Sequence, residues 1–294
     1  METFTNRIAV ITGAGSGMGR ELAVQLARNG AHVALCDISD EQLGETASLC
    51  RQAATSSEFV VSTTVADVSN ETDLERFAAE TTEAHQSDVV HLLFNNAGIG
   101  GSGSFVADDR GSWERTFDIC WKGVYLGCRV FLPMMRNADA GHIVNTASVN
   151  GLWASLGTDR AHTSYSAAKF AVRGFTEALV TDLRLHAPHI GCSVVMPGHI
   201  GTSIVANSSA VHGLPPDAGV TEMANAFRNN APTTAADAAT IILDGVREGR
   251  WRILVGEDAH ILDAMVREAP EQVYEKSFID QIHAAGILQA LVAE

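Results

Sequence analysis

The chain has 294 residues, 46% of them hydrophobic, and a formal net charge of −15. This composition suits one large α/β domain at least as well as two small ones. The strong acidity disfavours nucleic acid and an anionic membrane surface as partners, because both attract concentrated Lys and Arg. No run of 18 apolar residues occurs, so the sequence predicts no transmembrane helix and no membrane association.

The cysteines and the first residues indicate the compartment. Five cysteines are an odd number, and they are widely spaced without a CxxC pair. This pattern argues against a disulfide framework or a zinc site, and we expect no metal. The chain begins with a short polar segment that runs directly into an apolar one, so we expect no signal peptide. A cytoplasmic location, where thiols stay reduced, fits these features best.

Short apolar segments alternate with longer amphipathic ones along the chain. The apolar segments predict strands at 7–12, 32–37, 59–66, 89–95, 142–148, 192–197 and 252–255. The amphipathic segments predict helices near 18–29, 40–54, 70–86, 110–137, 164–187 and 234–248. Most of the strands are continuous apolar runs, which is typical of strands buried on both faces. We therefore predict a Rossmann-like, doubly wound parallel sheet of about seven strands with helices on both faces.

One region breaks this alternation, at about 199–232, where Gly, Ser, Asn and Pro are frequent. Long insertions of this kind are often binding loops, so we interpret it as a substrate lid, with a plain surface excursion as the alternative. We predict a single oxidoreductase domain over 1–256 and a helical extension over 257–294. The extension would cover either the substrate pocket or a neighbouring subunit, and the sequence does not choose between them.

A glycine-rich segment, Thr12–Gly19, follows the first predicted strand and leads into a helix. Glycines permit a tight turn there and let backbone N–H groups approach a pyrophosphate. Asp37 ends the second strand, where a carboxylate can accept hydrogen bonds from an adenosine ribose and would repel a 2′-phosphate. Residue 38 is Ile and not Arg, so the sequence predicts NAD and not NADP. The alternative role of Asp37, capping the next helix, suits Ser39 and Asp40 better.

Tyr165 and Lys169 lie four residues apart, which places them on one face of a helix. A nearby ammonium group can stabilise a phenolate and lower its pKa, so the two form a candidate acid–base pair. Taken alone, the same spacing fits a solvated Lys beside a half-buried Tyr at least as well. The interpretation depends on the other motifs of the chain.

Taken in order, the motifs resemble those of the short-chain dehydrogenase/reductase superfamily in its shorter, single-domain form. The resemblance covers roughly residues 5–256. Thr12–Gly19 is similar to TGxxxGxG, the segment 95–98 to NNAG, and the segment 165–169 to YxxxK. Ser148 follows the fifth predicted strand, where the family has its catalytic serine. The resemblance implies an NAD-dependent alcohol dehydrogenase or ketone reductase.

The resemblance also implies roles for individual residues. Ser148 would orient the substrate oxygen, Tyr165 would act as general acid/base, and Lys169 would hold the nicotinamide ribose and lower the pKa of Tyr165. Asp67 and Val68 would contact the adenine. The predicted cofactor-binding residues are Gly13, Ser16, Gly17, Met18, Gly19, Asp37, Ile38, Asp67, Val68, Asn95, Ala97, Gly98, Tyr165, Lys169, Pro197, Gly198, Ile200 and Thr202.

One position departs from the family pattern. In the helix before the fifth strand the family usually has an Asn that takes part in a proton relay, and this chain has Cys120 there. A thiol is a weaker donor and acceptor than an amide. We interpret Cys120 as a small buried residue and not as a catalytic one.

Three loops, 99–106, 149–162 and 199–232, are expected to form the substrate site. The predicted lining residues are Phe105, Leu152, Trp153, Leu156, His199, Val205, Met223 and Phe227. Most are apolar, and no Arg or Lys cluster accompanies them, which favours a neutral, fairly hydrophobic secondary alcohol or ketone. The resemblance further implies a homotetramer or homodimer built on the helices near 110–137 and 164–187.

Two rival functions remain open at this point. Epimerases and dehydratases that act on sugar nucleotides have a different glycine spacing and a separate substrate domain, which this chain lacks. A dinucleotide-binding regulatory module without catalysis would not need Ser148, Tyr165 and Lys169, although Cys120 leaves this alternative open.

Overall fold

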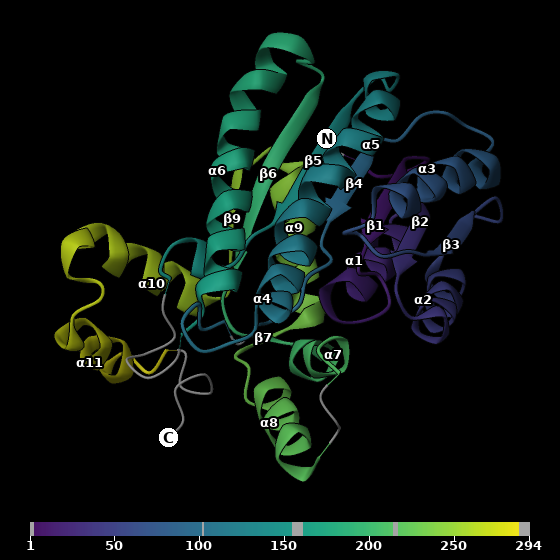
Figure 1. Cartoon of the computed structure of the whole chain (residues 1–294). Coiled ribbons are helices and arrows are strands. Elements are labelled where there is room, and N and C mark those ends of the chain that lie inside the picture. Colours follow the sequence, from purple (N-terminus) through teal and green to yellow (C-terminus); the bar gives the residue numbers. More distant parts are fainter. Residues whose placement is uncertain (1–2, 102, 155–160, 214–216, 288–294) are drawn as a thin grey trace.

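The computed structural model describes residues 3–101, 103–154, 161–213 and 217–287 (Figure 1). Its central sheet has seven parallel strands in the order β3-β2-β1-β4-β5-β6-β9. The strands are β1 (Ile8–Thr12), β2 (His32–Asp37), β3 (Val61–Val65), β4 (Leu92–Asn95), β5 (Gly141–Thr146), β6 (Ile190–Pro197) and β9 (Arg252–Val255). The predicted doubly wound fold is confirmed, and its strand order reverses between β1 and β4.

Helices cover both faces of this sheet because each helix buries one apolar stripe against it. On one face, α1 (Gly17–Arg28), α2 (Asp40–Ala53) and α9 (Ala235–Arg247) enclose a core that includes Leu22 and Ile242. On the other face, α3 (Glu71–His85), α5 (Gly123–Arg136) and α6 (Thr163–His186) enclose a second core that includes Phe77 and Phe131. Because both faces are covered, β1 and β4 are buried at every position, whereas the edge strand β3 has the polar sequence VSTTV and is partly exposed.

The helix predicted near 110–137 is not a single regular helix. It consists of α4 (Arg110–Phe117), a π-helical turn over Asp118–Lys122, and α5. The π-helical turn contains Cys120, the position at which the sequence departs from the family pattern. Such turns often occur at functional sites. The periodicity of the sequence did not reveal this one, because one wide turn changes the apolar spacing very little.

The region 199–232 is mostly helical. It contains β7 (Ile200–Gly201), α7 (Ile204–Val211) and α8 (Ala218–Asn229), and β7 pairs with β8 (Thr233–Thr234) just beyond it. Figure 1 shows α7 and α8 at the bottom, near the end of the sheet where β7 lies. The region therefore lies near the carboxyl ends of the strands, where doubly wound proteins bind their ligands.

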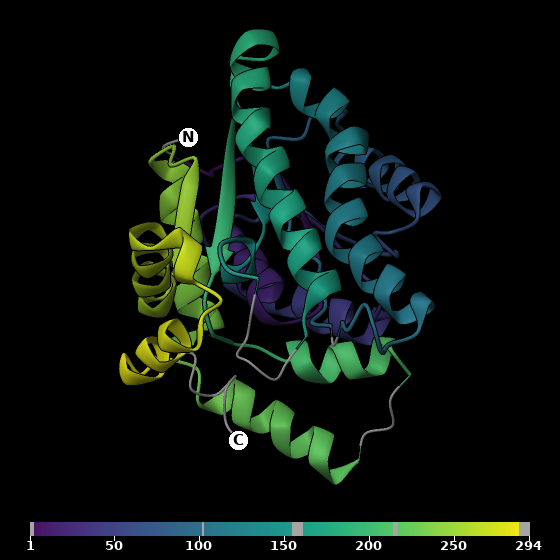
Figure 2. The same ribbon diagram turned by 60° about the vertical axis from the view of Figure 1, so that its left-hand side comes forward.

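The residues after β9 form two helices, α10 (Glu257–Glu268) and α11 (Lys276–Ala284), joined by a 3₁₀ turn over Pro270–Gln272. Figure 2 shows both helices on the same side of the molecule as β9. They share an apolar cluster with Val149 and Trp153, which follow β5. The C-terminal helices are thus packed on the segment that leads away from Ser148.

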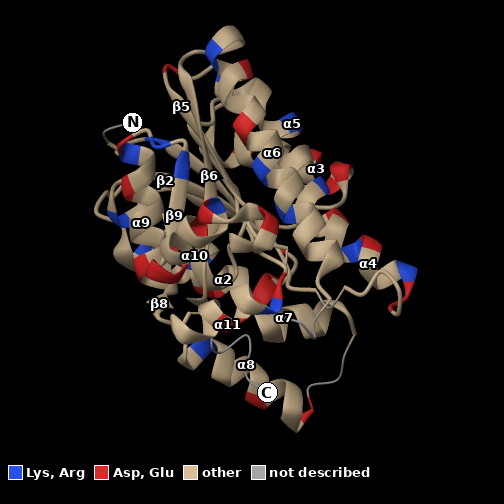
Figure 3. Ribbon diagram, turned by 90° about the vertical axis from the view of Figure 1, so that its left-hand side faces the viewer, with Lys and Arg blue, Asp and Glu red and all other residues tan. Residues whose placement is uncertain are grey.

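Two observations concern the surface. None of the helices in the described residues is long and apolar enough to cross a membrane. In the view of Figure 3, acidic and basic residues are interspersed along α4, α6 and α9.

Candidate active site

The glycine-rich turn after β1 is shaped by contacts that leave no room for side chains. Gly13 has φ +64°, and a Cβ atom there would lie 2.7 Å from the Cα atom of Ala97. A Cβ atom on Gly19 would lie 2.1 Å from the carbonyl oxygen of Gly13. Thr12 Oγ1 accepts hydrogen bonds from the backbone N–H groups of Asn96 and Ala97, both at 3.0 Å. The turn and the end of β4 are therefore held together closely.

A cavity of about 410 Å³ opens beside this turn. Eleven of the predicted cofactor-binding residues line it: Gly13, Ser16, Gly17, Met18, Asp37, Ile38, Asp67, Val68, Ala97, Gly98 and Thr202. Helix α1 begins at Gly17, at the wall of the cavity. The first N–H groups of a helix and its positive dipole end favour an anionic group such as a pyrophosphate.

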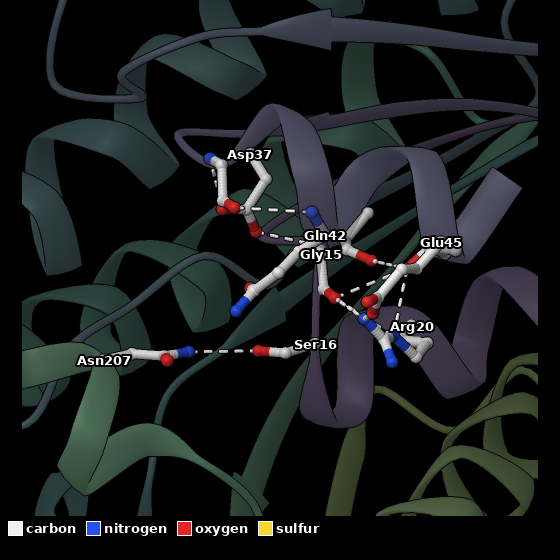
Figure 4. Close-up of polar contacts among 10 residues, drawn as sticks. Gly15, Ser16, Arg20, Asp37, Gln42, Glu45 and Asn207 are labelled. Atoms are coloured by element: carbon white, nitrogen blue, oxygen red, sulfur yellow. Dashed lines mark hydrogen bonds and ion pairs between the residues drawn. The ribbon is translucent and has the colours of Figure 1, made fainter.

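Asp37 lines the cavity through a carboxylate with two backbone partners. Its Oδ2 accepts a hydrogen bond from the N–H of Gly15 at 2.9 Å, and its Oδ1 accepts one from Ser39 at 3.2 Å (Figure 4). The side chain of Ser39 in turn caps α2 by accepting from the N–H of Gln42. These bonds fix the orientation of the carboxylate at the end of β2.

Arg115 is a cavity residue that the sequence did not identify. It projects from α4, and its Nη2 lies 2.8 Å from Oδ2 of Asp67, while its Nη1 donates to the hydroxyl of Ser69 at 2.8 Å. Burial raises the pKa of Asp67, but hydrogen bonds from Ser69 and Arg115 outweigh burial and hold that pKa below its usual range. Asp67 is thus kept ionised and fixed in orientation.

Helix α7 closes one side of the cavity through two polar contacts. Asn207 Nδ2 donates to the hydroxyl of Ser16 in the glycine turn at 3.0 Å, as Figure 4 shows. Ser208 accepts from the N–H of Gly100 at 2.7 Å. Ile204, Asn207, Ala210 and Val211 of this helix line the cavity. No sequence signal in the polar segment pointed to these four residues, because the contacts depend on how the helix is placed.

Some predicted cofactor residues lie behind the cavity and not on its wall. Asn95 is buried, and its amide donates to Asn145 at 2.8 Å, so it joins β4 to β5. The neighbouring Asn96 lines the cavity instead and donates to the carbonyl oxygen of Thr12 at 3.1 Å. The other predicted residues that are not part of the wall are Gly19, Tyr165, Lys169, Pro197, Gly198 and Ile200. The two neighbours differ because Asn95 is the last residue of β4 and is buried against β5, whereas Asn96 lies just beyond the strand.

The predicted catalytic residues lie next to the cavity, behind its wall residue Gly98. Ser148 follows β5 and caps a 3₁₀ turn by accepting from the N–H of Asn150 at 3.1 Å. Tyr165 lies in the first turn of α6, and Lys169 follows one turn later. A Cβ atom on Gly98, a wall residue, would lie 3.4 Å from Lys169 Nζ. The structure therefore brings this predicted group together at the cavity.

The electrostatic environment of Tyr165 differs from the expectation. Burial raises its pKa, the neighbouring Cys120 raises it further, and a hydrogen bond with Ser148 lowers it. The ammonium of Lys169 lies 5.4 Å from the centroid of the Tyr165 ring and donates to the carbonyl oxygen of Thr146 at 2.9 Å. Burial in turn lowers the pKa of Lys169. In this structure burial, and not Lys169, dominates the pKa of Tyr165.

Cys120 is fully buried beside this group. Its thiol donates a hydrogen bond to the carbonyl oxygen of Ile99 at 3.2 Å. A Cβ atom on Gly98 would lie 3.8 Å from its sulfur. The interpretation of Cys120 as a small buried residue agrees with these contacts. All five cysteines are free and buried.

His162 is a second neighbour of Tyr165 that the sequence did not single out. Its ring centroid lies 4.9 Å from that of Tyr165, just before α6 begins. Burial lowers its pKa to about 4, so the imidazole is neutral near neutral pH. The loop 149–162 was expected to border the substrate, but its pattern gave no reason to prefer this residue.

The predicted substrate-lining residues before α6 do not share one environment. Leu152 is buried in an apolar cluster with Val172 and Met196. The indole of Trp153 donates to the carbonyl oxygen of Val273 at 2.7 Å, so this side chain points into the C-terminal helices and not into an open site. Phe105 is 77% exposed and packs against Trp113. Leu156 lies outside the described residues.

The remaining predicted lining residues belong to the region 199–232. His199 is buried, and its Nε2 lies 2.6 Å from the carbonyl oxygen of Phe227. Val205 is partly buried on α7, and Met223 is exposed on α8. Of these four residues, His199 and Phe227 contact one another, so they connect the end of β6 to α8.

The arrangement combines a glycine-rich turn at a helix N-terminus and the Asp37 carboxylate, which both line one cavity, with a buried hydroxyl–phenol–ammonium group next to that cavity. The described residues contain no cluster of three or more side chains suited to a metal ion. These groups are suited to binding a dinucleotide and moving a proton at a carbon–oxygen bond.

Comparison with known proteins agrees with this geometry. The family model for short chain dehydrogenase matches residues 7–212. The chain is 38% identical to levodione reductase of Leifsonia aquatica over 209 residues, which are 70% of this chain and 73% of that protein. It is 35% identical over 200 residues to the 2-(R)-hydroxypropyl-CoM dehydrogenase of Xanthobacter autotrophicus, covering 67% and 76% of the two chains.

A solved structure is similar over nearly the whole chain. A short chain dehydrogenase/reductase from Burkholderia phymatum in complex with NAD superposes with a TM-score of 0.80 at 34% identity, covering 92% of this chain and 96% of the other. The chain belongs to the short-chain dehydrogenase/reductase family, a class of oxidoreductases.

Proposed function

We propose that the protein is an NAD-dependent dehydrogenase that interconverts a neutral, fairly hydrophobic secondary alcohol and its ketone. The observation that carries this proposal is the convergence of Ser148, Tyr165 and Lys169 next to Gly98, a wall residue of the cavity that Asp37 also lines. Levodione reductase and the hydroxypropyl-CoM dehydrogenase support the reaction class by their names.

The cavity suits a nicotinamide dinucleotide on several grounds. The turn beside the cavity has glycine where a side chain would collide with the wall residues Asp37 and Thr202, since a Cβ atom on Gly15 would lie 2.9 Å from the Asp37 carboxylate and one on Gly17 would lie 3.1 Å from Thr202. The carboxylate of Asp37 would accept from a free ribose 2′-hydroxyl and would repel a 2′-phosphate. Asp67, held by Arg115, would face the adenine. These features support NAD as the cofactor.

Three side chains, those of Ser148, Tyr165 and Lys169, have separate roles in the proposed reaction. When bound, oxidised NAD supplies the hydride acceptor and a positive charge. Ser148 holds the alcohol oxygen of the substrate and donates to it. Tyr165 removes the hydroxyl proton in the oxidation and returns it in the reduction. Because burial raises the pKa of Tyr165, the phenolate forms only where positive charge is nearby, and the buried ammonium of Lys169 supplies part of that charge.

Exposed aromatic side chains and free thiols support proposals about assembly and location. Tyr125 on α5 and Phe170 on α6 are 41% and 39% exposed, which is unusual for large side chains on helices that otherwise bury apolar surface. We propose that these helices meet a second copy in a dimer or tetramer. We further propose a cytoplasmic location, in which the five free thiols stay reduced.

The proposal is tested by NADH formation on a panel of secondary alcohols. The wild type should oxidise neutral cyclic or aromatic alcohols in preference to short hydroxy acids. Tyr165→Phe removes the proton acceptor but keeps the ring, so turnover should fall by about 10²–10⁴-fold. The dissociation constant for NADH should change by less than about twofold in that variant, because Tyr165 is not part of the cavity wall.

Two outcomes would contradict the proposal. Unchanged turnover in the Tyr165→Phe variant would show that the phenol is not the general acid/base. Tight NADH binding without turnover of any alcohol or ketone would favour a regulatory module.

A further inference from the structure

The segment after β6 lies between the sheet and the wall of the cavity. It runs from Pro197 through Gly198 and His199 to Thr202, which lines the cavity, and on into α7. The position of α7 depends on how this segment leaves the sheet. The question is which contacts fix its first residues.

Asp258, in the first turn of α10, makes that contact. Its side chain is buried, and its Oδ2 accepts a hydrogen bond from the backbone N–H of His199 at 2.6 Å. Its Oδ1 accepts from the N–H of Ala259 at 3.0 Å. A hydrogen bond from a backbone N–H to an ionised carboxylate is stronger than one between neutral groups. The carboxylate therefore holds the turn after β6 from a distance of 59 residues along the chain.

Two glycines show how closely this carboxylate approaches the backbone. A Cβ atom on Gly198 would lie 2.2 Å and 2.3 Å from the two carboxylate oxygens of Asp258. Gly256 has φ +95°, and a Cβ atom there would lie 2.5 Å from Oδ1. Both glycines leave room for this one side chain. The contact therefore depends on the residue types at three positions, Gly198, Gly256 and Asp258.

The same contact extends to α8 through His199. The imidazole of His199 is buried, its Nε2 lies 2.6 Å from the carbonyl oxygen of Phe227, and the two rings are 4.3 Å apart. Asp258 accepts a hydrogen bond from the backbone of His199, and the side chain of His199 contacts Phe227 of α8. Helix α8 is therefore connected to the start of α10 through His199.

A second, independent contact joins the C-terminal helices to the other side of the active site. Trp153 follows Ser148 by five residues, and its indole donates to Val273 at 2.7 Å. Its ring lies 5.7 Å from that of Phe278 on α11. The C-terminal helices thus contact both segments that flank the catalytic group, the one after Ser148 and the one after β6.

We propose that Asp258 is a positioning residue for the nicotinamide half of the cofactor, and that the C-terminal helices act as a support for the active site. This inference rests on the proposed function, in which the adenosine half lies at Asp37 and the nicotinamide half near Lys169 and Thr202. Loss of the Asp258 carboxylate releases the turn after β6 and leaves the adenosine end intact. The residue touches neither substrate nor cofactor and acts through the backbone of His199.

The experiment compares two probes, NADH and ADP-ribose, on the full chain. ADP-ribose contains the adenosine half and lacks the nicotinamide. Asp258→Ala should weaken NADH binding by about tenfold or more and reduce the fluorescence enhancement of bound NADH. ADP-ribose binding should stay within about twofold of the wild type. Asp258→Asn keeps an oxygen that can accept from His199, so it should restore NADH binding to within about threefold.

Asp263→Ala is the matched control. Asp263 lies on the same helix, is also buried, and pairs with Arg252 and Arg267, away from the turn after β6. Its loss should lower thermal stability and leave the ratio of the NADH and ADP-ribose dissociation constants unchanged. If Asp258→Ala does not fold, Asp258→Ser keeps a polar group in the first turn of the helix but is too short to reach His199. Asp258→Ser should then show the selective loss of NADH binding.

The outcomes separate the inference from the proposed function. Asp258 variants that weaken both probes equally, or neither, would overturn the inference while the wild type still binds NADH. An Asp258→Asn variant as impaired as Asp258→Ala would also overturn it. A wild-type protein that binds neither probe would overturn the proposed function, and the inference with it.

Discussion

Two turns at the carboxyl end of the sheet contribute residues to the cavity, the turn after β1 and the segment after β6 that ends at Thr202, and they are stabilised in different ways. The turn after β1 is held by its own glycines and by neighbouring strand ends, with Gly13 against Ala97 and Gly15 against Asp37. The turn after β6 is held by Asp258, a side chain from α10. The first turn is determined by neighbouring strands of the domain, and the second depends on a helix beyond the family core.

The difference shows why the sequence motif explains the conformation of the first turn and not the contacts that hold the second. A glycine motif determines its own conformation, since glycine adopts φ near +60° at less cost than residues with a Cβ atom. The turn after β6 has no positive-φ residue of its own before Thr202 among the described residues. Its conformation is imposed by a carboxylate that lies next to it only in the folded chain.

The largest expected effect comes from breaking the first turn. Gly13→Ala adds a methyl group 2.7 Å from a backbone atom at a positive φ, so we expect a loss of about 2–4 kcal/mol in the free energy of unfolding. NADH affinity should fall by about 100-fold or more. Chemical denaturation and NADH titration measure the two quantities.

Gly44→Ala is the control for that variant. Gly44 lies in α2 with nothing within 4 Å of an added Cβ atom, so the substitution should raise stability by about 0.5–1 kcal/mol. Equal effects at both glycines would mean that the close approach of Gly13 to Ala97 does not matter.

An intermediate effect is expected at the second turn. Gly198→Ala places a methyl group against the carboxylate of Asp258 and should cost about 2 kcal/mol of stability. In the Asp258→Ala background the same change should cost at least about 1 kcal/mol less, because the colliding group is gone. The double-mutant cycle is measured by denaturant unfolding. Strict additivity would show that the two positions do not act on each other.

The smallest effect concerns the charge at the first turn. Asp37→Ala removes the carboxylate that would repel a 2′-phosphate, and the preference for NADH over NADPH should fall by about tenfold, or about 1.4 kcal/mol. Because Asp37 is partly exposed, solvent screening keeps this change modest. Parallel titrations with NADH and NADPH measure it. An unchanged preference would assign cofactor selection to other residues of the cavity.

Much of the fold was predictable, because apolar runs of strand length and amphipathic helices report burial directly. The π-helical turn around Cys120 was not, since one wide turn hardly alters that pattern. Among the candidate site residues, Gly13, Asp37 and Ser148 could be selected from the sequence because each lies at or just after the end of a predicted strand. Arg115 was missed, because a single Arg on an amphipathic helix gives no sign of the carboxylate that it meets.

The sequence by itself determined the order of strands and helices, the glycine turn and the residue types at the strand ends, because these depend on local conformation and on the periodicity of burial. Only the tertiary structure decided that Trp153 points into the C-terminal helices, that Asn207 contacts Ser16, and that Asp258 holds His199. Each of these contacts joins segments far apart in the chain. These contacts form only when the helices pack together, and helix packing cannot be inferred from a local sequence pattern.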